Sequence, residues 1–328
     1  MPGPFYYRIV KYLRRISAAI LCALPLVLQA ADTKKIVLIA GKPSHGPLQH
    51  EHNAGSLLFQ RCLASVPNVE VIVYQNGWPT VANPFEGADS IVFFVTGGKA
   101  HEAIKENRLS ELRALMEKGV GFGAIHYGVE VPKENGGAEF LDWMGGYFET
   151  HWSVNPHWDA EFKLIPEHPI TRGVKPFTIN DEWYFHMRFQ PGMKGVTPIL
   201  SARAPASTMK RGDGAHSGNP AVRESVAAGA PQHVAWAYER PNGGRGFGFT
   251  GAHNHLNWGN PNFRKVVLNA LLWISKAEVP QGGVDCDVTD EDLMLNLDPK
   301  KGQRPRVRSR SDLRKQQQQQ FISPTLGK

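Results

Sequence analysis

Cysteine is scarce in this chain, with three residues in 328, and Cys22 lies in an apolar N-terminal stretch. The other two, Cys62 and Cys286, are too few for a disulfide-rich scaffold. Their number allows one bridge, but no feature of the sequence supports it. The body of roughly 250 residues is long enough to bury one large core without help from bridges or metals.

The chain also lacks a long hydrophobic run. Residues 16–28 are apolar but too short to span a bilayer comfortably. Basic residues precede this stretch and Ala30 and Ala31 follow it, which is typical of a secretory signal peptide over residues 1–30. We therefore expect an exported protein, periplasmic or secreted, with no stable membrane span after processing. An uncleaved anchor is the alternative.

A basic surface for nucleic acid is missing as well. The net charge is +7, but residues 1–30 carry four basic residues without an acidic one, and residues 299–328 carry a surplus of eight. Residues 31–298 therefore have a net charge of −5, which predicts no nucleic-acid partner. The extension 278–328 ends in an Arg-rich and Gln-rich tail that is typical of a disordered segment. The sequence does not indicate its role or the oligomeric state.

Apolar strands alternate with amphipathic helices through the first half of the chain. We predict strands at 34–40, 69–74, 90–95 and 120–125, with helices at 51–65 and 103–118. A strand at 160–165, two strands near 232–250 and a last helix at 263–276 follow. This order predicts an α/β domain over residues 31–277, with a mostly parallel sheet and helices on both faces. Residues 203–231, rich in Gly, Ala, Ser and Pro, are expected to form a surface insertion.

Histidines stand where three of these strands end: His45, His126 and His253. Because the carboxyl ends of parallel strands lie at one edge of a sheet, we expect these side chains to meet. Three imidazoles and a carboxylate would suit a divalent metal, most readily zinc. No H-E-x-x-H or C-x-x-C spacing supports a metal, and the alternative is a polar sugar pocket lined by hydrogen-bonding histidines.

Further candidates surround these strand ends. Glu182, in the acidic and aromatic block at 181–186, is a candidate general base, unless this block is a solvated turn. His126 and His253 are the other candidate catalytic residues. The expected substrate-binding residues are polar or aromatic side chains near the same edge: His50, Tyr127, His151, Trp183, Tyr184 and His255.

Six short motifs occur in order along the chain: AIHYG at 124–128, GGYFETH at 145–151, HPIT at 168–171, DEWY at 181–184, VAW at 234–236 and GGRGFGFTGAH at 243–253. With them the chain resembles the trehalose-utilisation (ThuA-like) family of the class I glutamine amidotransferase-like superfamily. That resemblance implies a flavodoxin-like sheet and a role in carbohydrate metabolism. It also implies that His126 stands where an amidotransferase has its nucleophilic cysteine, so glutaminase activity is not expected.

Two main functions remain open from the sequence, beside a weaker third hypothesis of a structural or interaction role led by the tail. The first is an exported enzyme of carbohydrate catabolism, of a hydrolase, lyase or isomerase type, acting on a disaccharide or keto-sugar at a His-rich pocket. The second is a non-catalytic sugar-binding module on the same fold. A divalent metal is the expected cofactor, and no nucleotide cofactor is expected. The sequence does not give the substrate or the bond that is changed.

Overall fold

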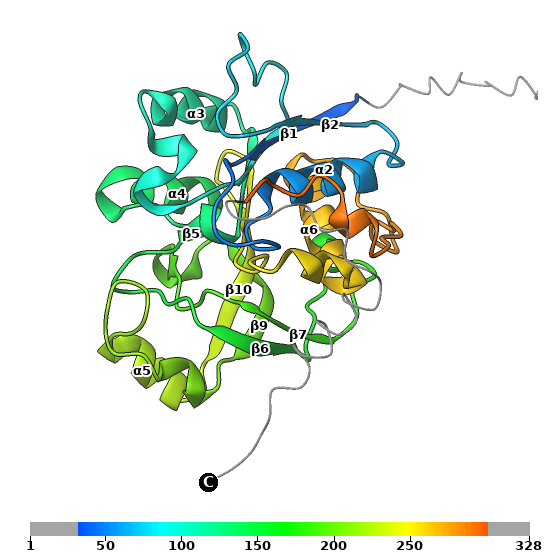
Figure 1. The fold of residues 1–328 in the computed structure, drawn as a ribbon. Helices are drawn as coiled ribbons and strands as arrows, with labels where there is room; N and C mark the ends of the chain where they lie inside the picture. The colour runs from blue at the N-terminus through cyan, green and yellow to red at the C-terminus, as the bar shows by residue number, and fades with distance from the viewer. Residues whose placement is uncertain (1–31, 301–328) are drawn as a thin grey trace, which may run out of the picture. The chain divides into compact units, whose positions relative to one another are not determined.

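The computed structural model describes residues 32–300, of which residues 33–300 belong to one compact unit (Figure 1). The expected signal peptide, residues 1–30, and the basic tail beyond residue 300 lie outside the described residues. Among residues 32–300, no helix is both long and apolar enough to cross a membrane.

A seven-stranded sheet forms the centre, in the order β2-β1-β3-β4-β11-β10-β9. The first five of these strands are parallel, whereas β10 and β9 run antiparallel to their neighbours. The predicted α/β fold with a mostly parallel sheet is therefore confirmed. The strands are β1 (Lys34–Ala40), β2 (Val69–Tyr74), β3 (Ser90–Phe94), β4 (Gly121–Ile125), β9 (Val196–Arg203), β10 (Pro231–Glu239) and β11 (Arg245–Phe249).

Helices cover both faces of this sheet. On one face, α2 (His52–Leu63) and α6 (Pro261–Ile274) pack on side chains such as Ile36 and Leu38 of β1. On the other face, α3 (Arg108–Glu117) and α4 (Ala138–Met144) pack on the alternate residues Val37 and Ile39. The central strands are apolar at nearly every position because successive side chains enter two different cores.

The second half of the chain adds two small antiparallel sheets. One pairs β5 (Gly146–Tyr147) with β8 (Arg188–Phe189), and the other pairs β6 (His157–Phe162) with β7 (Phe177–Glu182). The strand expected at 160–165 therefore begins and ends three residues earlier. The helix expected at 103–118 is also shorter, because 3₁₀ turns at Gly98–Ala100 and Glu102–Ile104 precede α3.

Residues 203–231 are more ordered than a surface insertion would be. They begin at the end of β9, make a 3₁₀ turn at Ala206–Met209, form α5 (Pro220–Ala227) and lead into β10. Val222 and Val226 of α5 are buried in the core, which fixes the segment against the sheet.

The C-terminal extension packs back on α2 and α6 as far as residue 300. Val279, Val284 and Leu293 are buried in the same core as these helices. A disulfide joins Cys62 of α2 to Cys286 of the extension, with 5.3 Å between the Cα atoms. The two cysteines thus form the single bridge that their number allowed.

Removing this disulfide should destabilise the protein measurably. It connects residues 224 positions apart, so it restricts the unfolded chain strongly, and native disulfides of this kind stabilise by about 2–5 kcal/mol. We expect Cys286→Ser to lower the free energy of unfolding by that amount in urea denaturation. A reductant should lower the wild-type stability to that of the variant and leave the variant unchanged. Equal midpoints for oxidised wild type and variant would contradict the prediction.

Candidate metal centre

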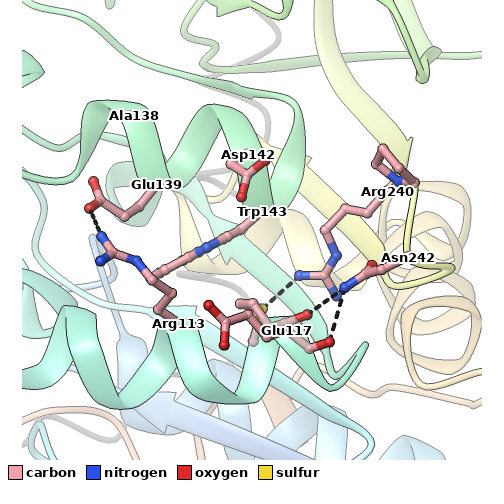
Figure 2. A pocket seen from close by; sticks show the side chains of 10 residues that line it. Arg113, Glu117, Ala138, Glu139, Asp142, Trp143, Arg240 and Asn242 are labelled. Carbon is pink, nitrogen blue, oxygen red and sulfur yellow. Dashed lines mark hydrogen bonds and ion pairs between the residues drawn. The ribbon is translucent and has the colours of Figure 1, made fainter.

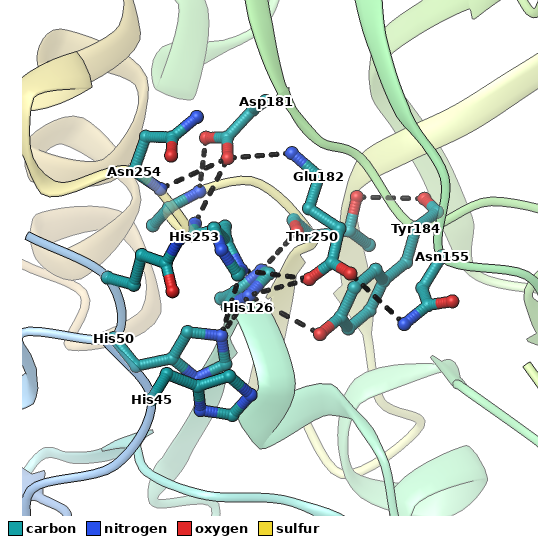
Figure 3. Close-up of polar contacts among 12 residues, drawn as sticks. His45, His50, His126, Asn155, Asp181, Glu182, Tyr184, Thr250, His253 and Asn254 are labelled. Carbon is teal, nitrogen blue, oxygen red and sulfur yellow. Dashed lines mark hydrogen bonds and ion pairs between the residues drawn. The ribbon is translucent and has the colours of Figure 1, made fainter. Parts of the chain in front are cut away.

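Four side chains converge where β4, β11 and β7 end and the loop after β1 crosses them. They belong to His50, His126, Glu182 and His253, and one ligand atom from each lies within 4.8 Å of all the others. Figure 3 shows the three imidazoles and the carboxylate turned toward a common point. His50 and His126 are fully buried, and Glu182 and His253 keep 14% and 7% of their side chains exposed. Access to the group is therefore from the side of Glu182 and His253.

His126 owes its position to the turn that follows β4. The residue has a φ of 52°, in the left-handed region, and begins the 3₁₀ turn His126–Val129. The turn also needs a glycine at position 128, because a Cβ there would lie 2.8 Å from the carbonyl oxygen of Phe93 on the neighbouring strand. The turn thus directs the imidazole across the carboxyl edge of the sheet, where ligands of open α/β sheets bind.

The hydrogen bonds of His126 define which of its nitrogens faces the group. Nδ1 donates to the carbonyl oxygen of Thr250 at 2.8 Å, so Nε2 carries a lone pair. That Nε2 lies 3.1 Å from Nε2 of His50, 3.6 Å from Glu182 Oε2 and 3.3 Å from the hydroxyl of Tyr184. A backbone carbonyl that orients the far nitrogen is the usual outer partner of a metal-binding histidine.

The remaining contacts are equally short. His253 Nδ1 lies 3.0 Å from His50 Nε2 and 2.9 Å from Glu182 Oε2. Ligands at 2.0–2.1 Å from a tetrahedral zinc ion are about 3.3 Å apart, which is close to these separations. The nitrogen and carboxylate donors also match the ligands that zinc accepts. The four residues could therefore hold a divalent metal.

Burial keeps the imidazoles of His50 and His126 in the neutral form that a metal requires. It lowers the pKa of His126 to about 3, and the neighbouring Glu182 only partly offsets this effect. Burial, together with the surrounding histidines, also depresses the pKa of His50. For Glu182, burial raises the pKa, but the hydrogen bond from His253 and the attraction that His126 exerts when protonated lower it below the ordinary value. At neutral pH the group thus presents neutral imidazoles at His50 and His126 and an ionised carboxylate at Glu182.

Asp181 supports the group from behind without facing it. The side chain is fully buried, and its oxygens accept hydrogen bonds from the backbone N–H groups of Ala252, His253 and Asn254 at 2.7–3.2 Å (Figure 3). It also accepts from Asn257 at 3.0 Å. This carboxylate fixes the loop that carries His253. The sequence placed Asp181 beside Glu182 in an acidic pair, but the two side chains point to opposite sides of the strand end.

The structure places His45 next to the group and not in it. His45 is exposed, and its ring stacks on that of His50 with 3.6 Å between centroids. His50, expected as a substrate-binding residue, supplies the ring that meets His126 and His253. Of the predicted metal set of His45, His126 and His253, the structure brings His126 and His253 together with His50, because the loop after β1 turns at residues 46–49 before it reaches the site.

The other predicted residues divide into two sets. Tyr184 contacts His126, and the ring of Tyr127 lies 5.9 Å from that of His50. Trp183 is instead in the core against Phe162 and Phe263, and buried His255 bonds to the carbonyl of Leu293. The exposed His151 is not in the group of four.

A second polar pair that the sequence did not suggest joins His216, in the segment between β9 and β10, to Glu130, which follows the turn after β4. His216 Nε2 donates to both carboxylate oxygens of the buried Glu130, at 3.0 and 3.1 Å. Its ring stacks on Phe148, which in turn contacts Tyr184. Asn155 joins the two regions, since its N–H donates to the carbonyl of His216 and its side chain donates to Glu182. The pair therefore lies along the approach to Glu182.

This pair should make stability depend on pH. The hydrogen bond to Glu130 raises the pKa of His216 above its ordinary value. A raised pKa adds stability that is fully present below the unfolded value of about 6.5 and is lost as the pH rises through the folded value. The difference in urea midpoint between wild type and Glu130→Gln should therefore be larger at about pH 6 than at about pH 8.5. A difference independent of pH would refute this.

A separate hollow of about 520 Å³ lies at the opposite end of β4 (Figure 2). It is lined by residues of α3, α4 and the turn at 240–242, and the ion pair Arg113–Glu139 closes one side. None of the predicted site residues reaches it. The chemistry suggested by the sequence is therefore concentrated at the carboxyl edge of the sheet.

The fold and this group define an α/β protein with a histidine–carboxylate site, competent for a metal, at the carboxyl edge of its sheet. The model of the ThuA family, described as trehalose utilisation, matches residues 37–274. The chain belongs to this family.

The first of two similar solved structures agrees with that assignment at the level of the fold. A ThuA-like protein from Bacteroides uniformis has 15% sequence identity and a TM-score of 0.51, with 76% of this chain and 94% of that chain covered. A ThuA-like protein from Parabacteroides merdae has 13% identity and a TM-score of 0.47, with 79% and 94% covered. No curated protein matches the sequence.

Proposed function

We propose that this protein is an exported, metal-dependent enzyme of carbohydrate metabolism that acts on a disaccharide or keto-sugar. The observation that carries the proposal is the convergence of three imidazole nitrogens and a carboxylate oxygen within 4.8 Å. Membership of a family described as trehalose utilisation supports a carbohydrate substrate. The disulfide between Cys62 and Cys286 supports export, because such bonds persist mainly in oxidising compartments.

Whether a metal fits depends on which of the facing imidazole nitrogens carry a proton. His126 Nε2 has no proton to give, because Nδ1 donates to Thr250. His50 Nε2 faces both this nitrogen and His253 Nδ1, so one proton cannot satisfy both contacts. A cation among these lone pairs and Glu182 would satisfy all of them. We propose zinc, held by the imidazoles of His50, His126 and His253 with Glu182 beside it, which when bound would polarise a sugar oxygen as a Lewis acid.

The other residues would bind the sugar and move protons. Glu182 is ionised and partly exposed, and Asn155 holds its second oxygen at 3.1 Å, so it is placed to accept a proton from a substrate hydroxyl. Burial raises the pKa of Tyr184 well above its ordinary value, so its hydroxyl stays protonated and can donate to the substrate. His216 and Glu130, on the approach to Glu182, would contact the distal part of the sugar.

Glutamine hydrolysis is not part of this proposal. The position at the end of β4 holds His126, and both cysteines among residues 32–300 are bonded to each other. No thiolate in this part of the chain can form the thioester that a class I amidotransferase needs.

The test is a metal analysis of purified protein, followed by assays on plain and oxidised disaccharides before and after chelation. We expect stoichiometric zinc and an activity that chelation removes and zinc restores. Protein that stays metal-free after dialysis against zinc would refute the metal-dependent enzyme. Sugar binding without turnover in that protein would then support the alternative, a binding module whose histidines bond to one another as His50 and His253 do at 3.0 Å.

A further inference from the structure

The end of the C-terminal extension crosses the loop that carries His50. Lys300 is 4% exposed at its side chain, and its Nζ donates to the carbonyl oxygens of Ser44 at 2.7 Å and Gln49 at 3.1 Å. These two carbonyls lie on either side of the turn between β1 and His50. One buried ammonium group therefore holds both ends of this turn together.

Two buried carboxylates complete the attachment. Lys300 Nζ lies 3.8 Å from Glu51 and 3.7 Å from Asp298, whose side chains are each 1% exposed. Glu51 accepts from the backbone N–H of Leu48 at 2.8 Å and from that of Asp298 at 2.7 Å. Asp298 also accepts from Asn53 at 2.6 Å. Buried charges persist when they are paired and hydrogen-bonded in this way, so the three residues form one unit.

The loop needs such an attachment because its backbone is strained. His45, Leu48 and His50 have φ values of 59°, 62° and 46°, in the left-handed region that residues other than glycine rarely adopt. Conformations of this kind persist only where the surroundings hold them. The bonds of Lys300 to Ser44 and Gln49, and of Glu51 to Leu48, fall within this stretch.

The ring of His50 has no orienting partner of its own. Its Nδ1 is buried and has no hydrogen-bond partner among the described residues, whereas Nδ1 of His126 is held by Thr250. A metal-binding histidine is normally oriented through its second nitrogen. For His50 the backbone must do this, helped by its N–H bond to the carbonyl of His253 at 3.1 Å.

We propose that Lys300, together with Glu51 and Asp298, is a positioning residue that holds His50 in the metal group from outside the family domain. The expected effect on metal binding rests on the proposed metal function, but the placement of His50 can be tested without a metal. Lys300 and Asp298 lie beyond residue 274, where the family match ends. The extension would thus complete a site that the domain builds only in part.

The first test compares zinc affinity in the full chain. Lys300→Met keeps the length of the side chain and removes the charge, and we expect zinc to bind about 10–100-fold more weakly, as for loss of an outer partner. X-ray absorption of the zinc-loaded variant should show one imidazole fewer. Lys265→Met is the control, because Lys265 holds the same extension at Gly282 and Asp285, away from the loop. The control should bind zinc as the wild type does.

The second test uses metal-free protein and diethyl pyrocarbonate, with modified histidines mapped by mass spectrometry. His50 should be protected in the wild type and in Lys265→Met and modified in Lys300→Met. The buried His101 should stay protected in all three, which separates a local change from unfolding. Asp298→Asn, a smaller change, should expose His50 in the same way and replaces Lys300→Met if that variant does not fold.

The outcomes separate the two proposals. Protection of His50 in folded Lys300→Met, or unchanged zinc affinity in that variant, would overturn the positioning role and leave the metal function intact. A wild type that binds no zinc, with His50 exposed only in the variants, would overturn the metal function while the positioning role stands.

Discussion

Replacing His126 by asparagine should abolish zinc binding, with a loss of affinity of more than about 100-fold, beyond the effect typical of an outer partner. Nε2 of His126 is within 3.6 Å of both His50 and Glu182, so the variant removes a central donor. Asparagine is chosen because the residue has a φ of 52°, where asparagine is tolerated and alanine is strained. Its shorter side chain cannot reach the group. Titration with zinc against a competing chelator measures the loss.

The control for this variant is His168→Asn. His168 is a half-buried histidine that accepts from the N–H of Ile170 and caps a 3₁₀ turn, and it is not one of the four residues of the group. It should bind zinc with the wild-type affinity. If His126→Asn kept that affinity too, any bound zinc would have to lie elsewhere, and the proposed centre would be wrong.

The central sheet could be predicted because its strands carry a strong pattern. β3 and β4 are buried along their whole length and β1 from Ile36 onward, and these stretches are almost entirely apolar or glycine. The same logic placed His126 and His253 together, since the carboxyl ends of β4 and β11 are neighbours in the sheet. Glu182 was also predicted near these histidines and lies beside them, although the small sheet that carries it was not predicted.

The choice between His45 and His50 could not be predicted. Both lie in the ten residues after β1, and which ring enters the site depends on three left-handed residues in that loop. No local residue preference specifies such a path, because bonds from the distant Lys300 and Asp298 support it. The positions of Trp183 and His255, away from the group of four, have a related cause. Trp183 packs against Phe263 of α6 and His255 bonds to Leu293 of the extension, and each of these partners is distant in sequence from the residue it contacts.

Replacing Asp181 by alanine should have the largest effect on stability, a loss of about 3–5 kcal/mol in the free energy of unfolding. The carboxylate is fully buried and accepts from three successive backbone N–H groups, at Ala252, His253 and Asn254, and from the side chain of Asn257. Each buried donor left without a partner costs about 1–3 kcal/mol, and relaxation of the loop recovers part of the sum. Urea denaturation of wild type and variant measures the difference.

The same substitution should also weaken zinc binding, since Asp181 holds the loop that positions His253. Ala252 has a φ of 90°, a conformation that an alanine does not keep unaided, and the bond from its N–H to Asp181 at 2.7 Å maintains it. Asp181→Asn is the matched variant, because it keeps one carbonyl oxygen as an acceptor and should lose less stability and less affinity than Asp181→Ala. If Asp181→Ala lost stability but bound zinc like the wild type, the loop would hold His253 in place without this carboxylate.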